Sequence, residues 1–119
     1  MESKNDDGGG QVLLITTDAL GSGNEELGRV LMVNCLRTLA AAERLPAVVL
    51  LMNAGVKLAL EGSPVLDALR GMEERGAEIR ACTTCLKFFN VLEKLAVGTA
   101  SGMGEAVETL TRAARTMTL

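Results

Sequence analysis

The stretch Ala47-Val-Val-Leu-Leu-Met52 is apolar at every position, and the turn-forming sequence Asn53-Ala-Gly55 follows it directly. An apolar run of strand length without alternating polar residues is typical of a strand buried on both faces. Gln11-Val-Leu-Leu-Ile-Thr16 has the same character, and residues 77–81 predict a third strand. Doubly buried strands belong to parallel sheets that helices cover on both sides, so these runs favour an α/β fold.

A long helix is expected between the first two strands, over residues 25–43. Either Asn24 or a capping box of Ser22 and Glu25 begins it. Its charged residues lie opposite an apolar stripe, as on a helix that covers a sheet. The stripe consists of Gly28, Leu31, Met32, Cys35, Leu36 and Leu39.

Shorter elements are predicted after the second strand. A helical segment is expected over 56–60, and the pair Ser63-Pro64 begins a helix that ends at Gly76. Residues 95–97 predict a short fourth strand, and Ser101 is expected to cap a last helix.

The alternation of strands and helices predicts parallel strands joined by right-handed crossovers. We therefore expect a flavodoxin-like, three-layer α/β/α sandwich with a mainly parallel sheet over residues 11–119. A strand order 2-1-3-4 would make the first and third strands neighbours and bring the loops after them together. Residues 1–10 are acidic and glycine-rich, so we expect a disordered tail or the remnant of a linker there.

The composition excludes several classes of function. The chain has 119 residues, 48% of them hydrophobic, which suits one domain with its own core. With 2% aromatic residues and a net charge of -3, neither a stacking platform nor a basic surface for nucleic acid is expected. The absence of histidine excludes histidine-based nucleophile pairs and histidine-ligated metal sites. We expect no cofactor and no zinc, because three cysteines are too few for a closed site.

The sequence also bears on the compartment. The amino-terminal residues lack the basic start, apolar centre and cleavage pattern of a signal peptide. No apolar run approaches the roughly 20 residues that a membrane helix needs. An odd number of cysteines excludes a fully paired set of disulfides. We therefore expect a cytoplasmic protein with no membrane association.

The strongest chemical feature is Cys82-Thr-Thr-Cys85, which follows the third strand directly. Cysteine is a nucleophile as the thiolate, and the free N–H groups at the start of a helix stabilise that anion without a histidine. Thr83 and Thr84 add hydroxyl donors, which would stabilise a persulfide too. The spacing also lets Cys85 resolve a sulfur atom carried on Cys82. The alternative is that both cysteines are small buried residues, as we expect for Cys35 on the first helix.

Two glycine-containing turns are further candidates for binding an anion. Gly21-Ser22-Gly23 precedes the first helix, whose N–H groups can bind an anion, but it is neither a P-loop nor a dinucleotide-binding motif. An ordinary turn is the alternative. Asn53, Gly55 and Lys57 follow the second strand, where Lys57 either attracts a sulfur anion or is simply solvated.

Several short sequences, weak singly, are specific in combination. They are Gly28-Arg-Val-Leu-Met32, Asn53-Ala-Gly-Val-Lys-Leu58, Glu61-Gly-Ser-Pro-Val-Leu66, Cys82-Thr-Thr-Cys-Leu86, and Val97-Gly98 with Met103. Over residues 11–115, this pattern resembles the DsrE-like domain of YedF-type proteins, which are sulfurtransferase-like proteins associated with selenium metabolism. The resemblance implies a DsrEFH-like sandwich that forms homo-oligomers, often trimers or hexamers.

For the site, the resemblance implies a sulfur relay in which a cysteine after the third strand carries a persulfide. Cys82 stands at the position of that cysteine, and Cys85 matches the second cysteine of the YedF-type version. The family usually has Gly where Thr83 stands and Asn where Gly102 stands, so the two loops depart from its pattern. A TusA-like sulfur carrier is an implied partner, because the TusA-like domain that commonly precedes this one is not part of the sequence.

Three functions remain open at this stage. The first is a sulfur-relay protein, whether or not it is itself a sulfurtransferase enzyme. The second is a thiol–disulfide redox protein that uses the same two cysteines; it ranks lower because a thioredoxin-like pair normally follows the first strand of its unit. The third is a non-catalytic, oligomeric binding or regulatory subunit.

Overall fold

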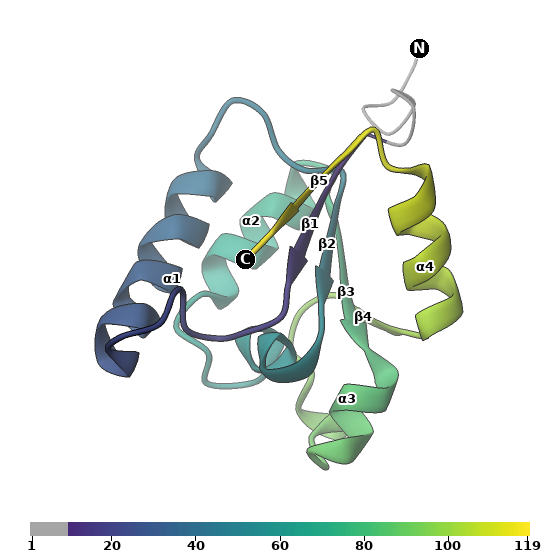
Figure 1. The fold of residues 1–119 in the computed structure, drawn as a ribbon. Coiled ribbons are helices and arrows are strands. Elements are labelled where there is room, and N and C mark those ends of the chain that lie inside the picture. The colour runs from purple at the N-terminus through teal and green to yellow at the C-terminus, as the bar shows by residue number, and fades with distance from the viewer. Residues whose placement is uncertain (1–9) are drawn as a thin grey trace.

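A five-stranded, entirely parallel sheet organises residues 10–119, the part of the chain that this computed structural model describes (Figure 1). The strand order is β4-β3-β2-β1-β5. The strands are β1 (Gln11–Ile15), β2 (Val48–Leu51), β3 (Glu78–Cys82), β4 (Thr99–Ser101) and β5 (Arg115–Thr118). The α-helices are α1 (Glu25–Ala40), α2 (Leu66–Glu74), α3 (Thr83–Phe88) and α4 (Met103–Arg112), and the 3₁₀ helices are η2 (Asn53–Ala59) and η3 (Leu92–Lys94).

Helices cover both faces of the sheet, which confirms the expected three-layer α/β class (Figure 1). From β1 to β4 the chain moves across the sheet in one direction, so right-handed crossovers place α1 and α2 on one face. The last connection returns past β1 to β5 and places α4 on the other face. The larger core, with Leu13 and Met32, lies beneath α1 and α2, and the smaller one, with Val12 and Ala106, lies beneath α4.

The carboxyl ends of the three central strands lie level with one another. Ile15 in β1 pairs with Leu51 in β2, and Leu51 pairs with Ala81 in β3. Asn53 and Cys82, which follow these pairs closely in sequence, therefore lie at the same edge of the sheet. This is the edge at which parallel α/β proteins bind ligands.

The observed strand order shows that the expected order 2-1-3-4 is wrong. β1 lies between β2 and β5, and β3 lies between β2 and β4, so the first and third strands are not neighbours. The second edge of β1 is taken by β5, which the sequence pattern did not predict. All four residues of β5, Arg-Thr-Met-Thr, are exposed, so no buried apolar run marks this strand.

The starts of two helices resolve open questions of the sequence. The Asn24 side chain accepts a hydrogen bond from the N–H of Leu27 at 2.8 Å, so Asn24 rather than Ser22 caps α1. The α2 helix begins at Leu66, later than the Ser63-Pro64 pair predicted. The Ser63 hydroxyl still accepts a bond from a backbone N–H, at 3.2 Å, but within the turn before the helix.

The fourth strand also lies later than expected. β4 occupies Thr99–Ser101, and the predicted strand at 95–97 is wrong. The backbone there bonds to the end of η2 instead of to the sheet, since the N–H of Ala96 donates to the carbonyl of Ala59 at 2.8 Å. None of the helices within residues 10–119 has both the length and the apolar character needed to cross a bilayer.

The expectation for the amino-terminal tail falls on residues 1–9, which lie outside the described residues. Gly10 is described, and its carbonyl accepts a hydrogen bond from the N–H of Ala114 at 2.9 Å. Gly10 thus lies at the junction between α4 and β5.

Candidate cysteine site

The two cysteines of the Cys82-Thr-Thr-Cys85 motif lie where β3 turns directly into α3. Cys82 is both the last residue of β3 and the N-cap of α3, with extended backbone angles. Its side chain is buried, with 7% of its surface exposed, whereas Cys85 in the first turn of α3 is half-buried. The motif therefore buries the sulfur of Cys82 and places the sulfur of Cys85 closer to solvent.

Asn53 at the end of β2 is bonded to this motif. Its backbone N–H donates a hydrogen bond to Sγ of Cys85 at 3.1 Å. Asn53 adopts the left-handed conformation with φ 51°, which asparagine tolerates better than most residues. The level ends of β2 and β3 explain why two residues so far apart in sequence meet here.

The pKa of the Cys85 thiol is shifted by its surroundings. Burial raises the pKa of the Cys85 thiol above its ordinary value, and the Asn53 N–H opposes this by lowering it. The Cys82 side chain raises the Cys85 pKa further, through a hydrogen bond that keeps the proton on Cys85 and through charge repulsion. Burial and the neighbouring Cys82 side chain therefore both favour the protonated form of Cys85.

We predict that Cys82→Ala lowers the pKa of Cys85 relative to the unchanged protein, because both contributions of the Cys82 side chain disappear while burial remains. Thiolates are the alkylated form, so the alkylation rate of Cys85 should reach its midpoint at a lower pH in the variant. Mass spectrometry of the Cys85 peptide after iodoacetamide pulses measures this, with Cys35 as the internal control. An unchanged midpoint would show that Cys82 does not influence Cys85, and a raised midpoint would show an influence opposite to the predicted one.

A small cavity lies beside Cys82, on the α4 side of the sheet. Its volume is about 10 Å³, and Met52, Ser101 and Met103 are among the residues that line it with Cys82. Ser101 is buried and its hydroxyl donates to the Glu105 carboxylate at 2.6 Å. Ser101 therefore does not cap α4 as expected, and Gly102 is the N-cap.

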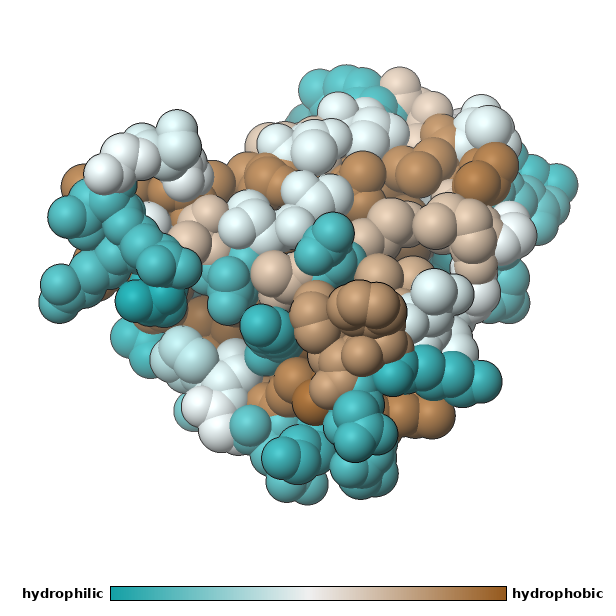
Figure 2. All heavy atoms as spheres, turned by 60° about the horizontal axis from the view of Figure 1, so that its bottom comes forward, coloured by the Kyte–Doolittle hydropathy of each residue, from teal (hydrophilic) through white to brown (hydrophobic). Residues whose placement is uncertain are grey.

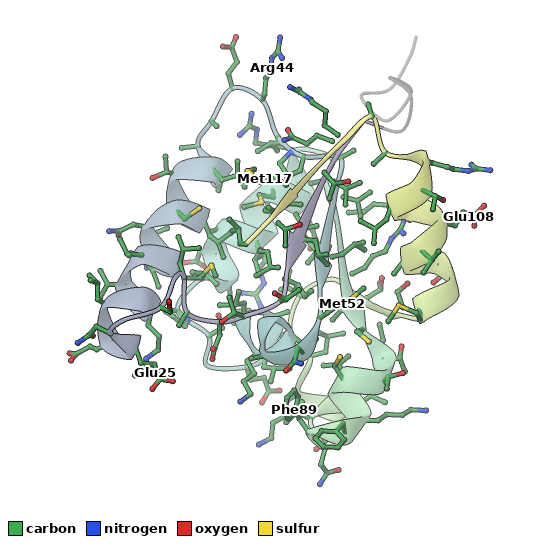
Figure 3. The ribbon with its side chains drawn as sticks, in the orientation of Figure 1. Glu25, Arg44, Met52, Phe89, Glu108 and Met117 are labelled. Atoms are coloured by element: carbon green, nitrogen blue, oxygen red, sulfur yellow. The ribbon has the colours of Figure 1, made fainter. Side chains whose placement is uncertain are left out.

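Two aromatic rings follow the cysteines on α3. Phe88 and Phe89 pack edge to face, with 5.7 Å between ring centroids. The ammonium group of Lys57, from η2, lies 4.8 Å from the centroid of the Phe89 ring. Figure 3 shows Phe89 beside α3 at the lower end of the molecule. Sequence reasoning singled out neither ring, although positions three and four after Cys85 share its face of a helix.

The structure brings together only part of the predicted set. Cys82, Cys85 and Asn53 form the centre, and Lys57 lies nearby on η2 through its contact with Phe89. Thr83 and Thr84 are the first residues of α3. Their hydroxyls make no hydrogen bond with another of the described residues.

The remaining predicted residues lie elsewhere. Gly55 is buried against the end of β1, where a Cβ would collide with the carbonyl oxygen of Ile15. The exposed turn Gly21-Ser22-Gly23 follows β1, which β2 separates from β3, so its expected meeting with the cysteines is wrong. Cys35 is half-buried on α1 and helps to line an apolar groove that Met117 borders. No cluster of three or more metal-binding side chains occurs within residues 10–119.

Comparison with known proteins supports the fold through structure rather than through sequence. No family model and no curated protein matches the sequence. The crystal structure of the ychN protein from E. coli is similar with a TM-score of 0.66 and 18% identity, over 92% of this chain and 99% of that one. MTH1491, a protein of unknown function from Methanobacterium thermoautotrophicum, is similar with a TM-score of 0.62 and 21% identity, over 88% and 96%.

The chain has a DsrEFH-like fold. This confirms the expected fold class, and the resemblance to the DsrE-like family is confirmed at the level of the fold. In a DsrEFH-like fold of this strand order, the carboxyl ends of β2, β3 and β4 converge, and they hold Asn53, the cysteine pair and Ser101.

Proposed function

We propose that this chain is a sulfur-relay protein that carries sulfane sulfur as a persulfide on Cys82, with Cys85 as the assisting thiol. One observation carries the proposal: the Asn53 N–H donates to Sγ of Cys85 at 3.1 Å, and the Cys82 side chain acts on the same thiol by raising its pKa. This arrangement positions the sulfur atoms of Cys82 and Cys85 without the help of a histidine. The resemblance to YedF-type proteins supports the same role.

Loading is a transfer of one sulfur atom. The Cys82 thiolate attacks the outer sulfur of a donor persulfide, R–S–SH, and a new S–S bond forms. The S–S bond of the donor breaks, the donor leaves as the thiolate R–S⁻, and Cys82 becomes Cys–S–SH. In the reverse direction, an acceptor thiolate takes the outer sulfur and Cys82 leaves as a thiolate, which the Cys85 S–H stabilises by hydrogen bonding.

The cavity beside Cys82 supports this assignment. Its volume of about 10 Å³ is of the order of one water-sized group. A persulfide adds a single sulfur atom, so the added atom fits the space with little rearrangement. The neighbours Met52 and Met103 are polarisable thioethers that suit contact with sulfur.

The test is intact-mass analysis after incubation with inorganic polysulfide and removal of the excess. We expect a mass gain of one sulfur atom that dithiothreitol reverses, located on the peptide that contains Cys82. No adduct on the protein, under conditions that load an established sulfur carrier, would contradict the proposal.

A thiol–disulfide redox function is the second candidate, because Cys82 and Cys85 form a C-x-x-C motif at the start of α3 and the Cys82 side chain acts on the Cys85 thiol. It predicts a reversible loss of two hydrogen atoms in glutathione buffers of cytosolic potential. A disulfide without any sulfur adduct would favour the redox function over the relay.

The finer expectations from the YedF-type resemblance belong to the same proposal. They are a homo-oligomeric assembly, sulfur exchange with a TusA-like carrier, a place in sulfur or selenium metabolism, and a cytoplasmic location. Sedimentation velocity at several concentrations tests the assembly directly, and a monomer throughout would contradict it.

A further inference from the structure

The surface around the cysteine pair has an unusual distribution of charge. All three lysines within residues 10–119 lie on α3 or on elements that contact it: Lys87 on α3, Lys57 on η2 and Lys94 on η3. These elements hold one acidic residue, Glu93, although the chain as a whole has a net charge of -3. Among the described residues, the ion pairs all use arginine, so no lysine there is neutralised by a carboxylate.

The same surface exposes Phe88. With 84% of its surface accessible, it is the most exposed of the large apolar side chains described. It lies one helical turn after Cys85 and packs against Phe89. Figure 2, which turns this end of the molecule forward, shows apolar residues bordered by hydrophilic ones. An exposed aromatic ring within a polar border is typical of the anchor of a protein–protein interface.

The shape of the site points in the same direction. Small-molecule sites are concave and usually enclose about 300–1,000 Å³. The cavity that Cys82 lines encloses about 10 Å³, and α3 projects from the end of the sheet (Figure 1). A site that encloses so little volume offers little to hold a small donor, but a larger partner can rest on it.

We propose that sulfur reaches Cys82 from a partner protein that carries a persulfide on an acidic segment. Phe88 is the apolar anchor of the surface on which this partner docks. The charged border of that surface consists of Lys57, Lys87 and Lys94. This rests on the proposed relay function. The transferred atom is the outer sulfur of the partner's cysteine persulfide, and the partner leaves as its cysteine thiolate. The lysines attract the acidic segment, and burial of the Phe88 ring holds it in place.

The experiment uses the full chain and three defined donors. Two synthetic peptides carry a single cysteine persulfide and differ only in their flanks, which are leucine with aspartate in one and serine in the other. Inorganic polysulfide is the third donor. The initial rate of persulfide formation on Cys82 is measured by mass spectrometry for the unchanged protein, for Phe88→Ala and for Leu27→Ala. Leu27 is the matched control, because it is 54% exposed on α1.

We expect the acidic peptide to load the unchanged protein at least about tenfold faster than the serine peptide at low concentration. Phe88→Ala should slow loading from the acidic peptide about tenfold, chiefly through KM, as loss of an interface anchor does. Loading from polysulfide should be unchanged in Phe88→Ala, and Leu27→Ala should match the unchanged protein throughout. Lys87→Glu should slow loading from the acidic peptide and leave the rate of loading from the serine peptide unchanged.

Other outcomes separate the two proposals. If polysulfide loads the unchanged protein but the two peptides react equally and Phe88→Ala has no effect, the docking proposal is overturned and the relay stands. If Lys87→Glu slows loading from polysulfide as much as loading from the acidic peptide, the lysines attract a small anionic donor. That outcome also overturns the docking proposal. If no donor loads the unchanged protein, the relay itself fails.

Discussion

Cys82→Ser should abolish persulfide loading, whereas Cys85→Ser should retain it. A serine hydroxyl is not a nucleophile towards sulfane sulfur at neutral pH without a base, and the chain has no histidine. A hydroxyl at position 85 can still donate a hydrogen bond to the Cys82 sulfur. Cys85→Ala removes that donor, and a hydrogen bond to a charged group is worth about 1.5–3 kcal/mol. Loading of Cys85→Ala should therefore be roughly ten- to a hundredfold slower.

The measurement is the mass of each variant after incubation with polysulfide, followed by the initial rate for those that load. Cys35→Ser is the matched control, because Cys35 lies on α1 away from the site and should load like the unchanged protein. A sulfur adduct on Cys85 in the Cys82→Ser variant, formed at the original rate, would identify Cys85 as the carrier and refute the assignment of roles.

Gly55→Ala should destabilise the fold by about 1–3 kcal/mol or more. A Cβ at this position would collide with the carbonyl oxygen of Ile15, which is backbone and cannot rotate away. The same carbonyl accepts a hydrogen bond from the N–H of Met52 at 2.9 Å, so relief requires η2 to move away from β1. That movement would also shift the Asn53 N–H from the Cys85 sulfur.

Urea unfolding measures this effect, and Gly71→Ala is the matched control. Gly71 lies within α2, and a Cβ there meets no atom within 4 Å. Replacing this helical glycine by alanine should stabilise the protein by about 0.5–1 kcal/mol. The two substitutions are chemically identical, but their effects on the free energy of unfolding should have opposite signs. Equal effects would mean that the contact between η2 and Ile15 is not tight in solution.

The buried strands could be predicted from sequence, and the order of the strands could not. β1 and β2 are apolar runs that only a sheet covered on both sides can bury, so their pattern identifies them. The order depends on which edge of β1 is free, and β5 occupies that edge. An edge strand with four exposed residues pairs through its backbone, which leaves almost no trace in the side chains.

The same distinction applies to the site. Cys82, Cys85 and Asn53 were predicted individually because each follows a recognisable strand. Their grouping with the Gly21-Ser22-Gly23 turn depended on the strand order and failed with it. The exposure of Phe88 could not be foreseen, because a ring next to a second phenylalanine in a short helix is usually expected to be buried.

The pairing of the first strand with the last has a consequence for fluctuations within the folded protein. β5 is paired on one side only, and the contact between Thr16 and Leu119 joins residues 103 positions apart. Strands of this kind open before the core does, and their amides exchange with solvent early. β2 and β3 lie on the other side of β1 and keep both neighbours when β5 detaches. Opening of the β5 edge therefore leaves the pairing of Cys82 with Ser101 of β4 in place, and the cysteine pair is insulated from it.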